Sequence, residues 1–276
     1  MKLRHAATHL GLLRVSVEAY GQAQPWRVET EPGRQPGEVA YRLRIDQPIP
    51  AEIAVVAGDV VHALRSALDT VVYDLARRHT GTLTRRQETK PAFGSRIDEQ
   101  AFEELEAKLR GLCGDRGVAA VRAVQPFSFA AEASRLGVEM NYDSAGEPSF
   151  DVPSRLNVLW NIDKHRRLLR LGWYPDLLYW QNEESKFEPA RVRPGEFIDG
   201  CLLGYFQAAA NHPGDTPTFQ FRLHLSDDPV PEPEDICEAL TSWHQTLGTW
   251  VVPRMFLTAS SDDPPPMLIA GDWPYR

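Results

Sequence analysis

Several features that would assign this chain to a functional class are missing from its sequence. The 276 residues include only three cysteines, far apart and without a CxxC pair: Cys113, Cys201 and Cys237. This pattern predicts neither a zinc knuckle nor a disulfide framework, and it favours a reducing cytoplasm. No window approaches about 18 consecutive apolar residues, and polar residues break the N-terminal apolar run. We therefore expect a soluble cytoplasmic protein without a membrane span.

The sequence also lacks an excess of basic residues and the common motifs of catalytic sites. Lys and Arg number 30 against 38 Asp and Glu, for a formal net charge of -8. This balance disfavours broad nucleic-acid binding, although a local basic patch could exist. The sequence has no GxxxxGK[ST], no GxGxxG after a strand, no HExxH and no GxSxG. Composition therefore leaves the function open, and no cofactor is expected.

The hydrophobic pattern predicts an α+β fold in which long antiparallel helices pack with an antiparallel sheet of N-terminal and C-terminal strands. Residues 12–20, 25–33 and 38–46 alternate apolar and polar, as half-buried strands do. Apolar residues repeat at helical spacing over 50–79, and Gly81 is the expected stop. Further helices are expected at 97–112, with Asp98 as N-cap, and at 117–127.

The second half of the chain is expected to continue with a loop over 128–153 and a helix over 154–170, with Ser154 as its N-cap. Strands are expected within 171–180, 196–206 and 218–226, before a final helix over 231–256. These elements predict one α+β domain: N-terminal strands 11–48, a helical core 50–170, C-terminal strands and helix 171–258, and an extended tail 259–276.

The helix expected at 50–79 carries a polar face as well as an apolar one. At 100° per residue, five polar residues fall within roughly 80° of one another: Asp59, His62, Ser66, Asp69 and Tyr73. Arg65 lies beside them and can pair with Asp69 four residues on. Either this face is solvated, or it meets a second layer and forms a hydrogen-bonded site.

The helix expected at 154–170 carries a second polar line. Asn157, Asn161 and His165 are spaced four apart along the edge of its apolar face, and Lys164 lies near the asparagines. An unsatisfied buried amide costs about 1–3 kcal/mol, so we expect the asparagines to hold a neighbouring loop or helix in register. His165 is the candidate for proton transfer, although a structural histidine is the commoner case.

Metal ligation would require two histidines and two carboxylates to meet across separate helices: His62, Asp69, Asp163 and His165. Spacing alone supports this meeting, so no metal site is predicted. The string HAATH (5–9) would place two more histidines one turn apart in a helix. No third ligand is near them in the sequence, and a packing or surface role is the expectation.

The strings GDVVHALRSALDTVVYDLA (58–76) and LNVLWNIDKHRRLL (156–169) resemble a group of uncharacterised bacterial proteins, many of them actinobacterial. That group carries a similar GD..H.LRS.LD helix, a QP segment (here 125–126) and an N.DKHR helix, so the resemblance covers residues 55–170. It implies no established activity. It implies that seven residues belong to one constellation: His62, Arg65, Asp69, Asn161, Asp163, Lys164 and His165.

A looser similarity is to HEPN-type helical domains, which include metal-independent ribonucleases of toxin and antiviral systems. Those enzymes carry an Arg, then four to six residues, then a His on one helix. Only Arg4 and His9 have this spacing here, outside the helices expected above, and Arg65 has Thr70 where the His could stand.

Two functions of different classes remain. The preferred one is a non-catalytic protein that binds a small ligand or a protein partner, because no complete catalytic motif is present. The alternative is a phosphodiesterase or ribonuclease with His165 as general acid/base and Arg65 or Lys164 stabilising negative charge. The expected ligand-binding residues are His62, Asp69, Asn157, Asn161 and Asp163. A homodimer built on the 50–79 helix is compatible with either function.

Overall fold

The structure is a computed structural model that describes residues 2–89, 91–96, 98–129, 131, 152–164, 168–190, 197–226 and 234–261. It has the α+β composition expected from the sequence, with antiparallel sheets and long helices. The chain forms two compact units, neither of them continuous in sequence. One comprises Met1–Leu10, Gly58–Arg167 and Leu240–Arg276, and the other comprises Gly11–Ala57 and Leu168–Ala239.

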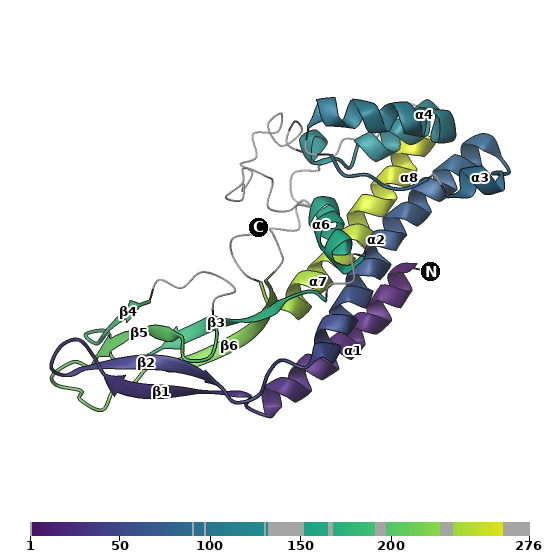
Figure 1. Ribbon diagram of the computed structural model, residues 1–276. Coiled ribbons are helices and arrows are strands. Elements are labelled where there is room, and N and C mark those ends of the chain that lie inside the picture. The colour runs from purple at the N-terminus through teal and green to yellow at the C-terminus, as the bar shows by residue number, and fades with distance from the viewer. Residues whose placement is uncertain are drawn as a thin grey trace. The chain divides into compact units, whose positions relative to one another are not determined.

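The second of these units contains both sheets (Figure 1). The larger sheet pairs four strands antiparallel, in the order β1 (Trp26–Pro32), β2 (Glu38–Ile45), β5 (Leu202–Gln207) and β4 (Lys186–Pro189). The smaller sheet pairs β3 (Leu171–Tyr179) with β6 (Thr218–Leu225). Strands from the two ends of the chain therefore share one sheet, which confirms the predicted arrangement. In β2, Tyr41 and Leu43 are buried two residues apart, as expected of a half-buried strand, and Ala40 is buried as well.

The strand expected at 12–20 is wrong, because these residues belong to helix α1 (Lys2–Gln22). Its buried residues are Ala6, Leu10, Leu13 and Tyr20, which recur at intervals of four, three and seven residues. This spacing places them on one helical face. The alternation in 12–20 matches a strand only when the preceding residues are ignored. Tyr20 lies next to Trp173 of β3 with a centroid separation of 5.6 Å.

Helix α2 (Ala51–Thr80) confirms the predicted helix over 50–79 to within one residue. It stops at Gly81, whose φ of +76° suits glycine and whose N–H donates to the Arg77 carbonyl at 2.8 Å. Most apolar residues of α2 are buried, including Val60, Leu64 and Leu68 at 0% exposure, whereas Val55 is 47% exposed. A homodimer built on this helix stays a prediction.

Helix α4 (Glu99–Arg122) joins the two helices predicted at 97–112 and 117–127. They meet at Gly114, where φ of +65° and ψ of −178° interrupt the helical backbone. Asp98 caps the first turn as predicted, since its carboxylate accepts from the Ala101 N–H at 2.7 Å. The short helix α3 (Arg85–Glu88) lies between α2 and α4 in the chain.

Helix α6 (Val152–Lys164) begins two residues before Ser154, so Ser154 lies in its first turn and is not the N-cap that the sequence predicted. Pro153 fits a first turn because its missing N–H would have no intrahelical partner there. The strand expected from 196 begins only at Leu202, because Gly200 turns the chain with φ of +79°. Much of the expected loop (130 and 132–151) and tail (262–276) lies outside the described residues.

The final helical segment runs as α7 (Ile236–Thr246), a π-helical turn η1 (Leu247–Val251) and α8 (Val252–Ser260). Pro253 follows this turn, has no N–H to donate and would clash with the carbonyl four residues earlier in a regular helix. Trp243, Leu247 and Met255 of this segment are buried. They belong to the unit that comprises Met1–Leu10, Gly58–Arg167 and Leu240–Arg276, which we call the helical unit. No helix among the described residues is long and apolar enough to span a membrane.

Candidate functional site

Arg65 and Asp69 of α2 hold the backbone of Phe93, and we call these two residues the Arg65–Asp69 clamp. Arg65 Nη1 donates to Asp69 Oδ1 at 2.5 Å, and its Nη2 donates to the Phe93 carbonyl. Asp69 Oδ1 also accepts from the Phe93 N–H at 2.8 Å. Arg65 is only 3% exposed, so this charge is compensated inside the protein. The pairing of Arg65 with Asp69 that the sequence predicts is therefore present.

The rest of the segment 91–96 is fixed by two further residues of the helical unit. Gln125, 0% exposed, accepts from the Arg96 N–H at 2.8 Å and donates to the Val121 carbonyl at 3.1 Å. Ser95 Oγ lies 2.5 Å from Ser154 Oγ of α6. Three distant parts of the chain thus converge on one extended segment. The QP segment of the resemblance contributes to this network through Gln125.

Helices α2 and α6 meet through the strings that carry the resemblance. A Cβ atom placed on Gly58 would lie 2.9 Å from Asp163 Oδ1, so glycine permits this close approach. Farther along α2, the Arg65 guanidinium lies 5.2 Å from the centre of the Trp160 ring. A cation over the face of an indole is a favourable contact. The two helices therefore lie close to each other at Asp163 and Trp160, a contact that the sequence had left open.

The other polar residues that the sequence singled out on these two helices are exposed or half-buried. On α2, His62 is exposed and its Nε2 lies 3.4 Å from Ser66 Oγ. On α6, Asn157 is half-buried, while Asn161 and Lys164 are exposed. Lys164 Nζ lies 4.8 Å from the centre of the Trp160 ring. We call His62, Asn161 and Lys164 the polar edge.

His165, the candidate general acid/base of the sequence analysis, lies outside the described residues. Of the other residues proposed for a site, Arg65 and Asp69 form the clamp, Asp163 faces Gly58, and the rest line the surface. The described residues contain no group of three or more His, Cys, Asp or Glu side chains placed to hold a metal ion.

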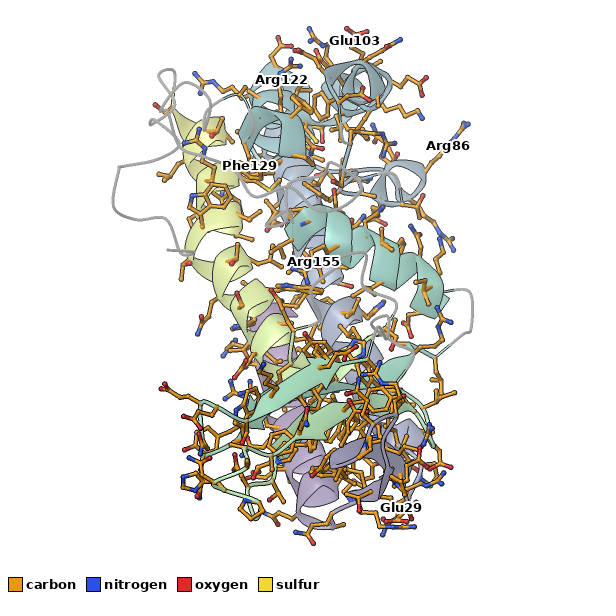
Figure 2. All side chains as sticks on the ribbon, turned by 90° about the vertical axis from the view of Figure 1, so that its left-hand side faces the viewer. Glu29, Arg86, Glu103, Arg122, Phe129 and Arg155 are labelled. Carbon is orange, nitrogen blue, oxygen red and sulfur yellow. The ribbon has the colours of Figure 1, made fainter. Side chains whose placement is uncertain are left out.

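Arg155 of α6, labelled in Figure 2, is a buried cation that the sequence analysis did not single out. Its guanidinium carbon lies 4.4 Å from the centre of the Trp243 ring, and the residue is 6% exposed. A charge so far from solvent contributes to packing between helices and is poorly placed for a diffusing ligand. Only its position on the apolar side of α6 marks it in the sequence.

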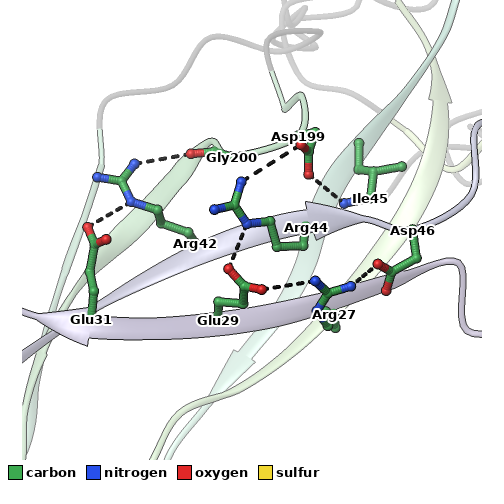
Figure 3. Close-up of polar contacts among 9 residues, drawn as sticks. All are labelled: Arg27, Glu29, Glu31, Arg42, Arg44, Ile45, Asp46, Asp199 and Gly200. Carbon is green, nitrogen blue, oxygen red and sulfur yellow. Dashed lines mark hydrogen bonds and ion pairs between the residues drawn. The ribbon is translucent and has the colours of Figure 1, made fainter.

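A second set of charges, also missed, covers strands β1 and β2 (Figure 3). Glu29 accepts from Arg44 Nε at 2.7 Å and from Arg27 Nη2 at 2.9 Å. These hydrogen bonds, the one from Arg44 above all, lower the pKa of the Glu29 carboxyl from its ordinary 4.5. Arg27 also pairs with Asp46, and Arg44 lies 3.8 Å from Asp199.

The same row of charges continues with Arg42, whose Nε donates to Glu31 at 2.7 Å and whose Nη1 donates to the Gly200 carbonyl at 3.1 Å. Ion pairs between Arg and Glu side chains of an edge strand and its neighbour stabilise the register, and exposed charges discourage pairing with another sheet. We therefore interpret this surface as structural. Its signal in the sequence was a charged residue at every second position: Arg27, Glu29 and Glu31 in one strand, and Arg42 and Arg44 in the next.

A third polar group involves the HAATH string, which lies in α1. His5 Nε2 and His9 Nε2 are 3.1 Å apart, and His9 Nδ1 is 3.6 Å from Asp59 Oδ2 of α2. Arg4 also belongs to this helix, so the one Arg–His pair with HEPN-type spacing is helical. This pair lies outside the helices expected from the sequence, because α1 is not among them.

Comparisons with protein-family models, with curated proteins and with solved structures give no match for this chain.

Proposed function

We infer that this protein is a non-catalytic binding protein that holds a small polar ligand or a partner at the polar edge of α2 and α6. The observation that carries this proposal is the Arg65–Asp69 clamp. Arg65 is the residue best suited to stabilise negative charge on a substrate, yet it is 3% exposed and bonded to Asp69 and Phe93. We assign Arg65 a structural role: its hydrogen bonds to Asp69 and Phe93 stabilise the part of α2 that carries His62 of the polar edge.

The positions of residues around the axis of α2 support a binding surface next to the contact between α2 and α6. At 100° per residue, His62 lies about 40° from Gly58 and about 60° from Arg65, the two residues that approach α6. Lys164 lies one residue after Asp163, which approaches Gly58. An imidazole, an amide and an ammonium group can each donate a hydrogen bond, so they suit a ligand with carboxylate or phosphate oxygens.

The chemistry of the three cysteines agrees with a reducing compartment, where we place the protein. All three are free, and burial raises the pKa of Cys113 to about 11. A thiol held in its neutral form is a poor nucleophile.

The proposal is tested on tag-free protein purified from cells, by native mass spectrometry for a bound small molecule. A panel of small carboxylates and phosphates is screened in parallel by thermal shift. We expect a ligand whose binding is lost in the double variant His62→Ala/Lys164→Ala and kept in Arg77→Ala, which removes an exposed charge from the last turn of α2. A protein that carries no bound mass and is stabilised by none of the compounds would overturn the proposal.

A metal-independent phosphodiesterase or ribonuclease is the second candidate, and one observation favours it. Arg4 and His9 lie on one helix, and His9 Nδ1 is 3.6 Å from a carboxylate. In such an enzyme either His9 or His165 would act as general acid/base. Cleavage of single-stranded RNA in EDTA that is lost in His9→Ala or His165→Ala, and kept in His62→Ala, would establish it. An inactive wild-type protein would exclude it.

A further inference from the structure

Two histidines face each other on the first turns of α1. His5 and His9 are one turn apart, and their rings meet edge to face with centroids 4.4 Å apart and planes inclined by 79°. Their Nε2 atoms are 3.1 Å apart. Next to them, Ala6 and Leu10 are buried, which fixes the rotation of the helix and holds the pair at the border of core and solvent.

The distance between these nitrogens matches a shared metal ion. Imidazole nitrogen binds zinc at about 2.0–2.1 Å. Two such bonds that span 3.1 Å subtend an angle of about 98° at the metal. This value lies between the ideal angles of octahedral and tetrahedral coordination, about 90° and 109°. Little movement of the side chains is therefore needed to bind a metal.

Asp59 supplies the second requirement, a partner for the other nitrogen of a ligating histidine. His9 Nδ1 is buried and makes no hydrogen bond within the described part of the chain, and Asp59 Oδ2 lies 3.6 Å away. A carboxylate at this position favours the tautomer with the proton on Nδ1, which leaves the Nε2 lone pair for the metal. The His9 ring needs only a small rotation to complete this hydrogen bond.

We propose that His5 and His9 bind a divalent late transition-metal ion such as Zn²⁺ through their Nε2 atoms, with Asp59 as the positioning residue. Because no third His, Cys, Asp or Glu of the described residues completes the set, water or a bound molecule fills the other positions. Imidazole ligands select zinc, copper or nickel over magnesium and calcium. This site is separate from the polar edge and does not depend on its role.

The test is a competition titration of tag-free protein with Zn²⁺ against a chromogenic chelator. We expect one equivalent to bind, and His5→Ala and His9→Ala to raise the dissociation constant at least tenfold. Asp59→Asn should raise it by about 10- to 100-fold, as loss of such a carboxylate does in known sites. His62→Ala is the matched control, because His62 is exposed on a helix with Ser66, not a histidine, four residues on.

A spectroscopic measurement identifies the ligands. The Cu²⁺-loaded protein should show electron paramagnetic resonance hyperfine structure from two nitrogens, reduced to one in His5→Ala. Because His5 is exposed, this variant should keep the circular dichroism spectrum of the wild type. Zinc affinity that is unchanged in His5→Ala would overturn the site. Affinity that is equal in Asp59→Asn and His62→Ala would overturn the role of Asp59.

Discussion

Replacing Asp69 by alanine removes the carboxylate from the Arg65–Asp69 clamp. Asp69 Oδ1 accepts two hydrogen bonds, from Arg65 at 2.5 Å and from the Phe93 N–H at 2.8 Å. The substitution leaves a buried guanidinium and a backbone N–H without their acceptor. Breaking a buried ion pair costs about 3–5 kcal/mol. Because the Asp69 side chain is 33% exposed and solvent screens it in part, we expect about 3 kcal/mol, at the lower end.

This loss should lower the melting temperature by about 6–12 °C, since 1 kcal/mol corresponds to about 2–4 °C at 150–250 residues. Urea unfolding followed by circular dichroism gives the free energy, and hydrogen exchange with mass spectrometry gives the local effect. The peptide that contains residues 91–96 should exchange faster in Asp69→Ala, because both anchors of Phe93 are weakened.

Asp74→Ala is the control, because Asp74 is a half-buried residue of the same helix with no hydrogen bond or ion pair to the described residues. We expect it to change the free energy of unfolding by less than about 0.5 kcal/mol. The reasoning is refuted if Asp69→Ala matches Asp74→Ala in stability and leaves exchange at 91–96 unchanged.

Three other predictions test separate parts of the structure. Gly204→Ala should destabilise the protein by about 1–3 kcal/mol in urea unfolding, because the new Cβ would lie 2.5 Å from the Glu188 carbonyl oxygen; an unchanged midpoint would contradict this contact. Glu29→Gln should destabilise the protein at pH 7. The lowered pKa of Glu29 stabilises the folded state above about pH 4.5, and this contribution is lost as the pH falls through the folded-state pKa. The difference from wild type should therefore shrink as the pH falls below about 4.5, and a difference that stays constant into the acid range would refute the assignment. Burial raises the pKa of Cys237 to about 12, so iodoacetamide should not label it in the native protein at pH 8, where roughly 0.01% is thiolate; rapid native labelling would contradict its environment.

Periodicity predicted the elements whose burial is regular. In α2 the buried residues recur at helical spacing over 30 residues, so no neighbour is needed to recognise the helix. Strands β1, β2 and β6 begin and end within one residue of the predicted bounds, although the burial of their side chains alternates only in part. Such patterns are local, and they are present in the sequence whatever the tertiary contacts.

Helix α1 was not predicted because its apolar residues fit both the two-residue period of a strand and the 3.6-residue period of a helix. Leu13, Val15 and Val17 alternate as in a strand, but Val15 is 65% exposed whereas Leu13 is buried. The helical period becomes clear only when Ala6 and Leu10 are counted with Leu13. The choice between the two periods depends on what packs against the segment, which a short window of sequence does not contain.

The sequence could predict those contacts of the candidate site that join two side chains of the same helix. The pair Arg65 and Asp69 follows from a spacing of four residues. Their third partner, Phe93, was not predictable because it contributes backbone N–H and C=O groups, which every residue except proline has. The role of Gln125 was hidden for the same reason, since both of its partners are backbone groups.

A high-resolution crystal structure of the protein isolated from cells tests the central claim most directly, through the electron density around Arg65, His62 and Lys164. The claim is that Arg65 has a structural role and that ligands bind at the polar edge. We predict that Arg65 remains bonded to Asp69 and Phe93, and that a bound molecule contacts His62 or Lys164. A bound anion that contacts the Arg65 guanidinium, with its bond to Asp69 broken, would contradict the account.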